Sequence, residues 1–72
     1  MSFQAYLANI EAKTGKTPEQ FRLWGRERGF STTAGLADGV KAGAIVAALK
    51  AEFGLGHGHA MAIVALLKGK KQ

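Results

Sequence analysis

The chain has 72 residues, with ten lysines and arginines against five aspartates and glutamates, a formal net charge of +5 and no cysteine. This length allows one small domain, which buries only roughly 60% of the surface of its unfolded chain and is marginally stable alone. The absence of cysteine excludes disulfides and cysteine-bound metal, and the positive charge favours acidic partners such as nucleic acid or a phosphate-bearing ligand.

The first predicted helix lies between Ser2 and Gly15. Ser2 is suited to the N-cap, and Gly15 to the end of the helix. The apolar residues between them recur at the spacing that gathers side chains on one helix face: Phe3, Tyr6, Leu7 and Ile10. This pattern predicts an amphipathic helix.

The second predicted helix begins at the segment TPEQ, residues 17–20, in which the threonine caps, the proline occupies the first turn and the glutamine can complete a capping box. Gly29 ends this helix, and Phe30 follows in position for the hydrophobic contact that accompanies a glycine cap. Gly25 lies on the same side as Trp24, where it either lets a neighbour pack closely or marks a frayed last turn.

Two arginines, Arg22 and Arg26, lie one turn apart on the outer face of this helix. Like charges at that spacing repel each other weakly, and an anionic partner would relieve the repulsion. The alternative is that both guanidinium groups are simply solvated. Together with Lys41 and Lys68, they make up the predicted basic surface.

Residues 31–39 contain two glycines, few large apolar side chains and no sustained period. We expect a flexible loop here and no second site. No strand pattern competes with the predicted helices.

The third predicted helix covers about residues 40–53. Its core-facing residues fall within one stripe: Ala42, Ile45, Val46, Leu49 and Phe53. Its back is an alanine face: Ala44, Ala47, Ala48 and Ala51. This face is either the solvated side of a good helix former or a surface that another helix or subunit can approach closely.

The last predicted helix begins near Gly58 or His59 and continues to Leu67. Glycines before a helix start let an anion approach backbone N–H groups that lack partners and lie at the positive end of the helix dipole. We therefore expect a ligand site in the Gly/His segment, residues 56–59: Gly56, His57, Gly58 and His59. In the alternative interpretation the glycines only form a tight turn, and His59 is a structural histidine.

No metal site, cofactor or catalytic activity is expected. His57 and His59 are two residues apart, which does not bring their side chains together on a helix. The acidic residues show no paired spacing, the serines lack a glycine elbow, and the Gly/His segment lacks the strand and the Lys-Ser/Thr ending of a P-loop. These features argue against an enzyme.

The predicted architecture is all-α: one domain over residues 1–72, built as a compact bundle of four short helices. The third and fourth helices are joined by the Gly/His-rich turn, and residues 69–72 form a frayed basic tail. The chain starts without the features of a secretory signal, and no apolar run reaches the roughly 20 residues of a membrane span. We expect a soluble cytoplasmic protein that does not contact membranes.

Two stretches carry a resemblance to a known family: NIEAKTGKTPE at residues 9–19 and GLGHGHAMA at residues 54–62. They resemble the two signatures of a small bacterial family, domain-of-unknown-function family 4287. The resemblance covers most of the chain except residues 31–39. It implies no activity, because the family has none assigned.

Two functions from different classes remain open. The first is a basic helical module that binds an anionic ligand or nucleic acid at the Gly/His segment. The second is a module for protein interaction or homodimer formation, without a small-molecule ligand, that uses the alanine face.

Overall fold

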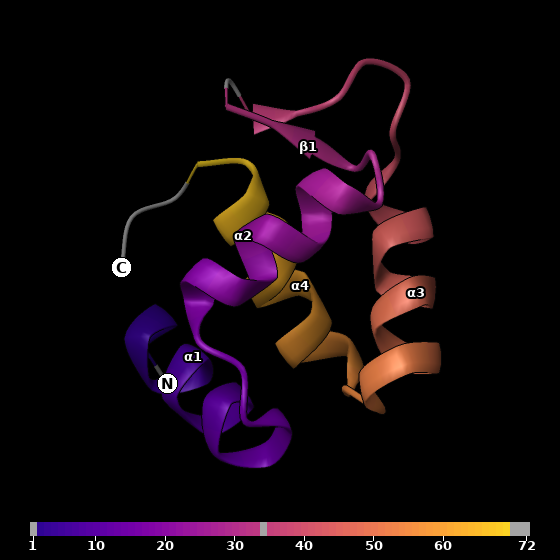
Figure 1. Ribbon diagram of the computed structural model, residues 1–72. Coiled ribbons are helices and arrows are strands. Elements are labelled where there is room, and N and C mark those ends of the chain that lie inside the picture. The colour runs from indigo at the N-terminus through magenta and orange to yellow at the C-terminus, as the bar shows by residue number, and fades with distance from the viewer. Residues whose placement is uncertain (1, 34, 70–72) are drawn as a thin grey trace.

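A computed structural model describes residues 2–33 and 35–69, so most of the predicted basic tail, residues 70–72, lies outside the described residues. Within these ranges the chain forms four helices and one short hairpin (Figure 1): α1 (Phe3–Thr14), α2 (Pro18–Glu27), β1 (Ser31–Thr32), β2 (Gly35–Leu36), α3 (Ala42–Phe53) and α4 (His57–Leu67). The prediction of an essentially all-α bundle of four short helices is confirmed.

Helix α4 is the centre of the fold. It packs against α1, α2 and α3, and six of its eleven residues are buried. A helix that is apolar on nearly every side is typical of such a central position. No helix in the described ranges, α4 included, is long and apolar enough to cross a membrane.

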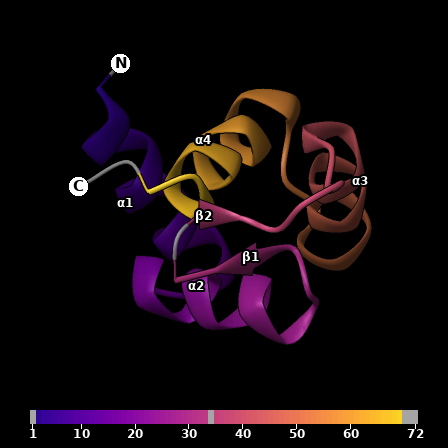
Figure 2. The same ribbon diagram turned by 90° about the horizontal axis from the view of Figure 1, so that it is seen from above.

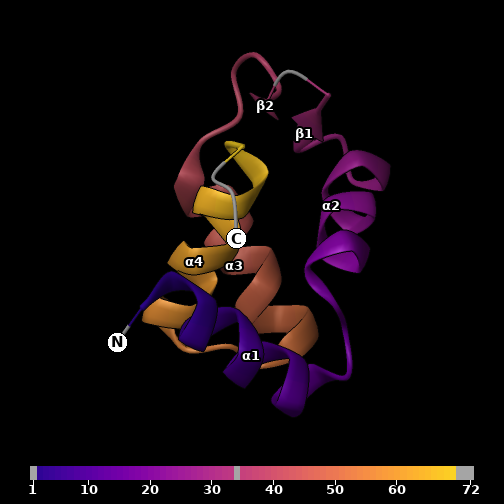
Figure 3. The ribbon, with the colours of Figure 1, turned by 90° about the vertical axis from the view of Figure 1, so that its left-hand side faces the viewer.

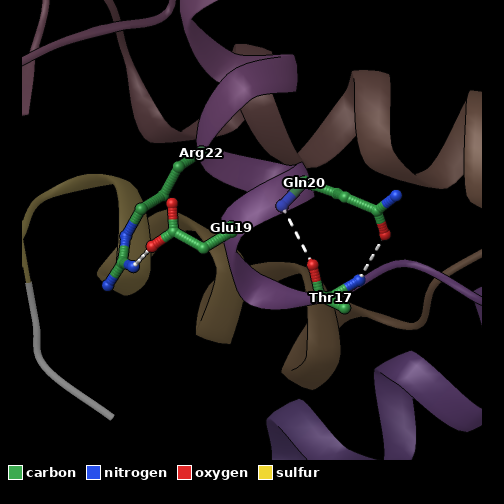
Figure 4. A network of polar contacts seen from close by, with 4 residues as sticks. All are labelled: Thr17, Glu19, Gln20 and Arg22. Atoms are coloured by element: carbon green, nitrogen blue, oxygen red, sulfur yellow. Dashed lines mark hydrogen bonds and ion pairs between the residues drawn. The ribbon is translucent and has the colours of Figure 1, made fainter.

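Both ends of α2 match the prediction. The Thr17 hydroxyl accepts a hydrogen bond from the Gln20 N–H at 3.2 Å, and the Gln20 side-chain oxygen accepts one from the Thr17 N–H at 2.8 Å (Figure 4). At the other end Gly29 has a φ of 76°, and the Phe30 N–H donates to the Gly25 carbonyl at 2.8 Å. The contacts at Gly29 and Phe30 form a Schellman motif, which ends the helix and directs the chain into β1.

Two helix starts differ from the prediction. Helix α3 begins at Ala42, later than expected, because the Val40 N–H donates to the Ala37 carbonyl at 3.2 Å in a preceding turn. Helix α4 begins at His57, earlier than expected, with Gly56 at the N-cap. Gly58 is therefore helical, which shows that the packing of α4 outweighs the penalty of about 1 kcal/mol for glycine in a helix.

The hairpin corrects the expectation of a loop without strands at residues 31–39. Ser31 pairs with Leu36 and Thr32 with Gly35 in an antiparallel ladder. Strands of two residues are too short to show the alternation that predicts strands from sequence. The hairpin lies at the same end of the molecule as the C-terminal end of α4 (Figures 1 and 3).

Helix α2 closely approaches the rest of the molecule at Gly25, which is buried. A Cβ atom at this position would lie 2.8 Å from Leu67 Cδ2 and 2.8 Å from the Ser31 hydroxyl oxygen. These separations are well below the roughly 3.5 to 4.0 Å of an ordinary van der Waals contact. The glycine thus lets α2 touch both the end of α4 and β1. This supports the interpretation that Gly25 allows a neighbour to pack closely, over the interpretation of a frayed last turn.

The same substitution at two glycines tests this packing. We expect Gly25→Ala to lower the free energy of unfolding by about 1 kcal/mol, because the side chains of Leu67 and Ser31 must shift to admit the new Cβ. Gly43→Ala is the matched control: it lies exposed in α3 with no atom within 4 Å of a new Cβ. The control should raise stability by up to about 1 kcal/mol.

Urea denaturation followed by the fluorescence of the single tryptophan, Trp24, measures both variants. Equal stabilisation by the two substitutions would contradict the close packing at Gly25.

Candidate functional site

The predicted ligand residues lie at the start of α4. Gly56, His57 and Gly58 are exposed, and the His59 ring packs edge-on against the Tyr6 ring with centroids 5.5 Å apart. Among the described residues, the N–H groups of residues 57–59 have no acceptor, whereas the Ala60 N–H donates to the Gly56 carbonyl at 2.9 Å. The Gly/His segment therefore presents unpaired donors, as the sequence predicts.

The predicted arginines do not lie near this segment. Arg22 and Arg26 belong to α2, and Lys68 is the C-cap of α4, at the end of α4 opposite to the Gly/His segment (Figure 1). Eleven helical residues separate these ends by about 16 Å. Lys41, the N-cap of α3, is exposed. Lys13 reaches toward the Gly/His end, where its Nζ donates to the Gly54 carbonyl at 3.2 Å.

A different site is formed where α2, the hairpin and the end of α4 meet. Here β1 lies beside α2, and β2 lies beside the C-terminal end of α4 (Figure 2). Helix α2, the hairpin and the end of α4 surround a cavity of about 140 Å³, which we name the arginine cavity. It is lined by Arg22, Arg26, Ser31, Thr32, Thr33, Gly35, Leu67 and Gly69. The sequence pattern indicates the two arginines of this site but not its hydroxyl groups, because the hydroxyl residues join the arginines only when the hairpin forms.

Ser31 contributes a hydroxyl group to the wall of the arginine cavity. The residue is only 7% exposed, and its hydroxyl makes no hydrogen bond within the described part of the chain. Among the described residues, no side-chain nitrogen or oxygen that is sealed from solvent lacks a partner. The Ser31 hydroxyl must therefore open onto the cavity, where it is free to donate and to accept.

The two guanidinium groups of the cavity are only weakly engaged. Arg22 forms an ion pair with Glu19 (Figure 4), and the Glu19 side chain is 74% exposed. Exposed pairs of this kind are worth only about 0 to 1 kcal/mol. Arg26 has no ion-pair partner among the described residues. Arg28, by contrast, is bound to Glu52 and does not line the cavity.

The electrostatic balance of the arginine cavity is positive. The C-terminal end of α4 contributes a partial charge of about −0.5, and the exposed Glu19 carboxylate offsets one of the two guanidinium charges. The second guanidinium, on Arg26, outweighs the helix end. Lys68, which caps α4 at this end, adds further positive charge.

Among the described residues, the charged and polar groups on the cavity wall are arginines and hydroxyls, without a carboxylate or imidazole. Neither histidine is near it, because His57 and His59 lie at the other end of α4. Within residues 2–33 and 35–69, no three histidine, aspartate or glutamate side chains lie close enough together to hold a metal ion. The wall is thus suited to holding an anion by charge and hydrogen bonds.

Comparison with known proteins places the chain in a family. The family model DUF4287, a domain of unknown function, matches residues 2–69. No curated protein and no solved structure gives a significant match. The match spans nearly the whole chain, including the stretches at residues 9–19 and 54–62 that resemble the family. The chain therefore belongs to the DUF4287 family of domains of unknown function.

Proposed function

We propose that the protein is a small basic binding module that holds an anionic ligand in the arginine cavity. The observation that carries the proposal is that Arg22, Arg26 and the nearly buried Ser31, whose hydroxyl has no partner among the described residues, line one cavity. A hydrogen bond to a charged group is stronger than a neutral one and contributes about 1.5 to 3 kcal/mol. Two guanidinium groups and one hydroxyl in one cavity therefore favour an oxyanion.

The net charge of the chain supports the same ligand class. A formal charge of +5 on 72 residues raises the rate of encounter with anions, in a manner that salt weakens. Binding without catalysis fits the wall of the cavity best, because proton transfer at neutral pH commonly uses imidazole or carboxylate groups, and none of the described residues on that wall carries either.

The Gly/His segment stays a second candidate position for the anion. Its support is the set of three unpaired N–H groups at the start of α4, together with the partial positive charge of the helix end. The arginine cavity is favoured over it because full charges on two side chains exceed the roughly half charge of a helix end.

Titration with inorganic phosphate at low salt, followed by amide NMR, tests the proposal and locates the site. We expect shifts at Ser31, Thr32 and Gly35. Arg22→Gln or Arg26→Gln should weaken phosphate binding about tenfold or more, because each removes a charge-assisted hydrogen bond. Lys41→Gln and Lys50→Gln are matched controls, since each removes one positive charge at an exposed position outside the cavity.

Equal weakening by the arginine variants and the lysine controls would mean that only net charge matters. Shifts confined to residues 56–59 would move the site to the Gly/His segment. No shift at either place, with phosphate, nucleotides, or short DNA or RNA, would rule out the anion-binding function.

A second candidate function is protein interaction or homodimer formation through the alanine face. The observation in its favour is that Ala44, Ala47 and Ala51 are all exposed on α3, so that a helix of another chain could approach closely.

Ala47→Glu tests this second function. If the alanine face joins two copies, the mass in solution should exceed that of a monomer for the original chain and fall to the monomer mass for the variant. The reason is that a buried and unpaired carboxylate opposes association. A monomer at high concentration, with capture of protein partners unchanged by Ala47→Glu, would show that the face is only solvated.

A further inference from the structure

We infer that the arginine cavity selects a phosphomonoester, whose phosphorus carries one organic substituent, over a phosphodiester such as a nucleic-acid backbone. The inference rests on the proposed function and adds the ligand class. It follows from the burial of Ser31, the elements that surround it and the number of hydrogen-bond donors that the cavity offers.

Ser31 lines the cavity from a nearly buried position. The residue is more than nine-tenths buried and lies on β1, which packs against α2. Since the Ser31 hydroxyl has no partner within the described part of the chain, a ligand oxygen can bond to it without breaking a protein hydrogen bond. A ligand that gains this bond must therefore place an oxygen inside the cavity, beside Ser31.

Three elements crowd this position. The position of a Cβ on Gly25 falls 2.8 Å from the Ser31 hydroxyl oxygen, and that of a Cβ on Gly35 falls 3.5 Å from the Lys68 carbonyl oxygen. The hairpin thus sits against the end of α4, and α2 closes on both. A phosphate that projects from the end of a molecule, with one organic substituent, can enter such a recess. A diester phosphorus is flanked by substituents on two sides, which hinders entry.

The number of hydrogen-bond donors in the cavity also fits a phosphomonoester better than a phosphodiester. The two guanidinium groups carry five N–H donors each, and the serine adds an O–H. A phosphomonoester presents three terminal oxygens and carries a charge of about −1.5 to −2 at pH 7, whereas a backbone diester carries about −1. The third oxygen can reach Ser31 while the other two bond to Arg22 and Arg26.

Methyl phosphate and dimethyl phosphate form a matched pair of probes for this selectivity. In amide NMR titrations of the full chain at low salt, we expect methyl phosphate to shift Ser31 and Gly35, and dimethyl phosphate to bind at least tenfold more weakly. Inorganic phosphate is the third probe, and it should bind no more than severalfold more tightly than methyl phosphate, because the recess leaves one oxygen of the monoester directed outward.

Ser31→Ala tests the contribution of the hydroxyl to binding separately from that of the arginine charges. We expect methyl phosphate to bind about tenfold more weakly to this variant, and the melting temperature to stay the same or rise, because no protein hydrogen bond is removed. Binding of dimethyl phosphate should not change. Wild-type affinity of the variant for methyl phosphate would overturn the inference. Should the variant fail to fold, the comparison of the two esters on the original chain decides.

The outcomes separate the inference from the proposed function. If both esters bind equally, and both depend on Arg22 and Arg26, the selectivity is wrong and the anion-binding function stands. If inorganic phosphate binds and methyl phosphate does not, the inference is again wrong, because the cavity then holds a free ion. If none of the three probes binds, the proposed function fails as well.

Discussion

The close approach of α2 to the end of α4 and to β1 is the contact on which the rest of the structure depends. It is possible because Gly25 has no Cβ, so that Leu67 and Ser31 occupy the space that a side chain would fill. This contact brings one face of α2 over the hairpin and places Arg22 and Arg26 on the wall of the same cavity as the Ser31 hydroxyl. A larger residue at position 25 would separate the charges from that hydroxyl.

Helix α4 has two ends of different chemistry. Its N-terminal end presents unpaired N–H groups and two histidines, and its C-terminal end closes the arginine cavity. The two stretches that resemble the DUF4287 family meet at the first of these ends, where Lys13 donates to the Gly54 carbonyl. Nearby, the rings of Tyr6 and His59 pack edge to face. This end thus joins α1 to the α3–α4 connection, which gives the glycines and His59 a structural role whether or not an anion binds there.

The parts of the fold that could be predicted from sequence are those set by local contacts. The caps at Thr17 and Gly29 depend on neighbours within a few residues, and the apolar spacing of the helices depends on their own period. The hairpin and the arginine cavity could not be predicted, because they depend on contacts between distant residues, such as Gly35 with Lys68 and Gly25 with Leu67. The arginines themselves were identifiable as a basic surface, whereas the hydroxyl that they face was not. Gly25, within an otherwise strong helix pattern, was a local signal of close packing. It did not indicate that the neighbours would be Leu67 and Ser31.

The most direct measurement of the central contact is a set of nuclear Overhauser effects in the unliganded protein. Strong effects are predicted from the Gly25 Hα protons to the Leu67 methyl groups and to the Ser31 Hβ protons, since the side-chain atoms of both residues lie within ordinary contact distance of that glycine. Their absence, in a sample that shows the expected effects between α3 and α4, would mean that α2 does not close on the hairpin. The arginine cavity would then not exist as described.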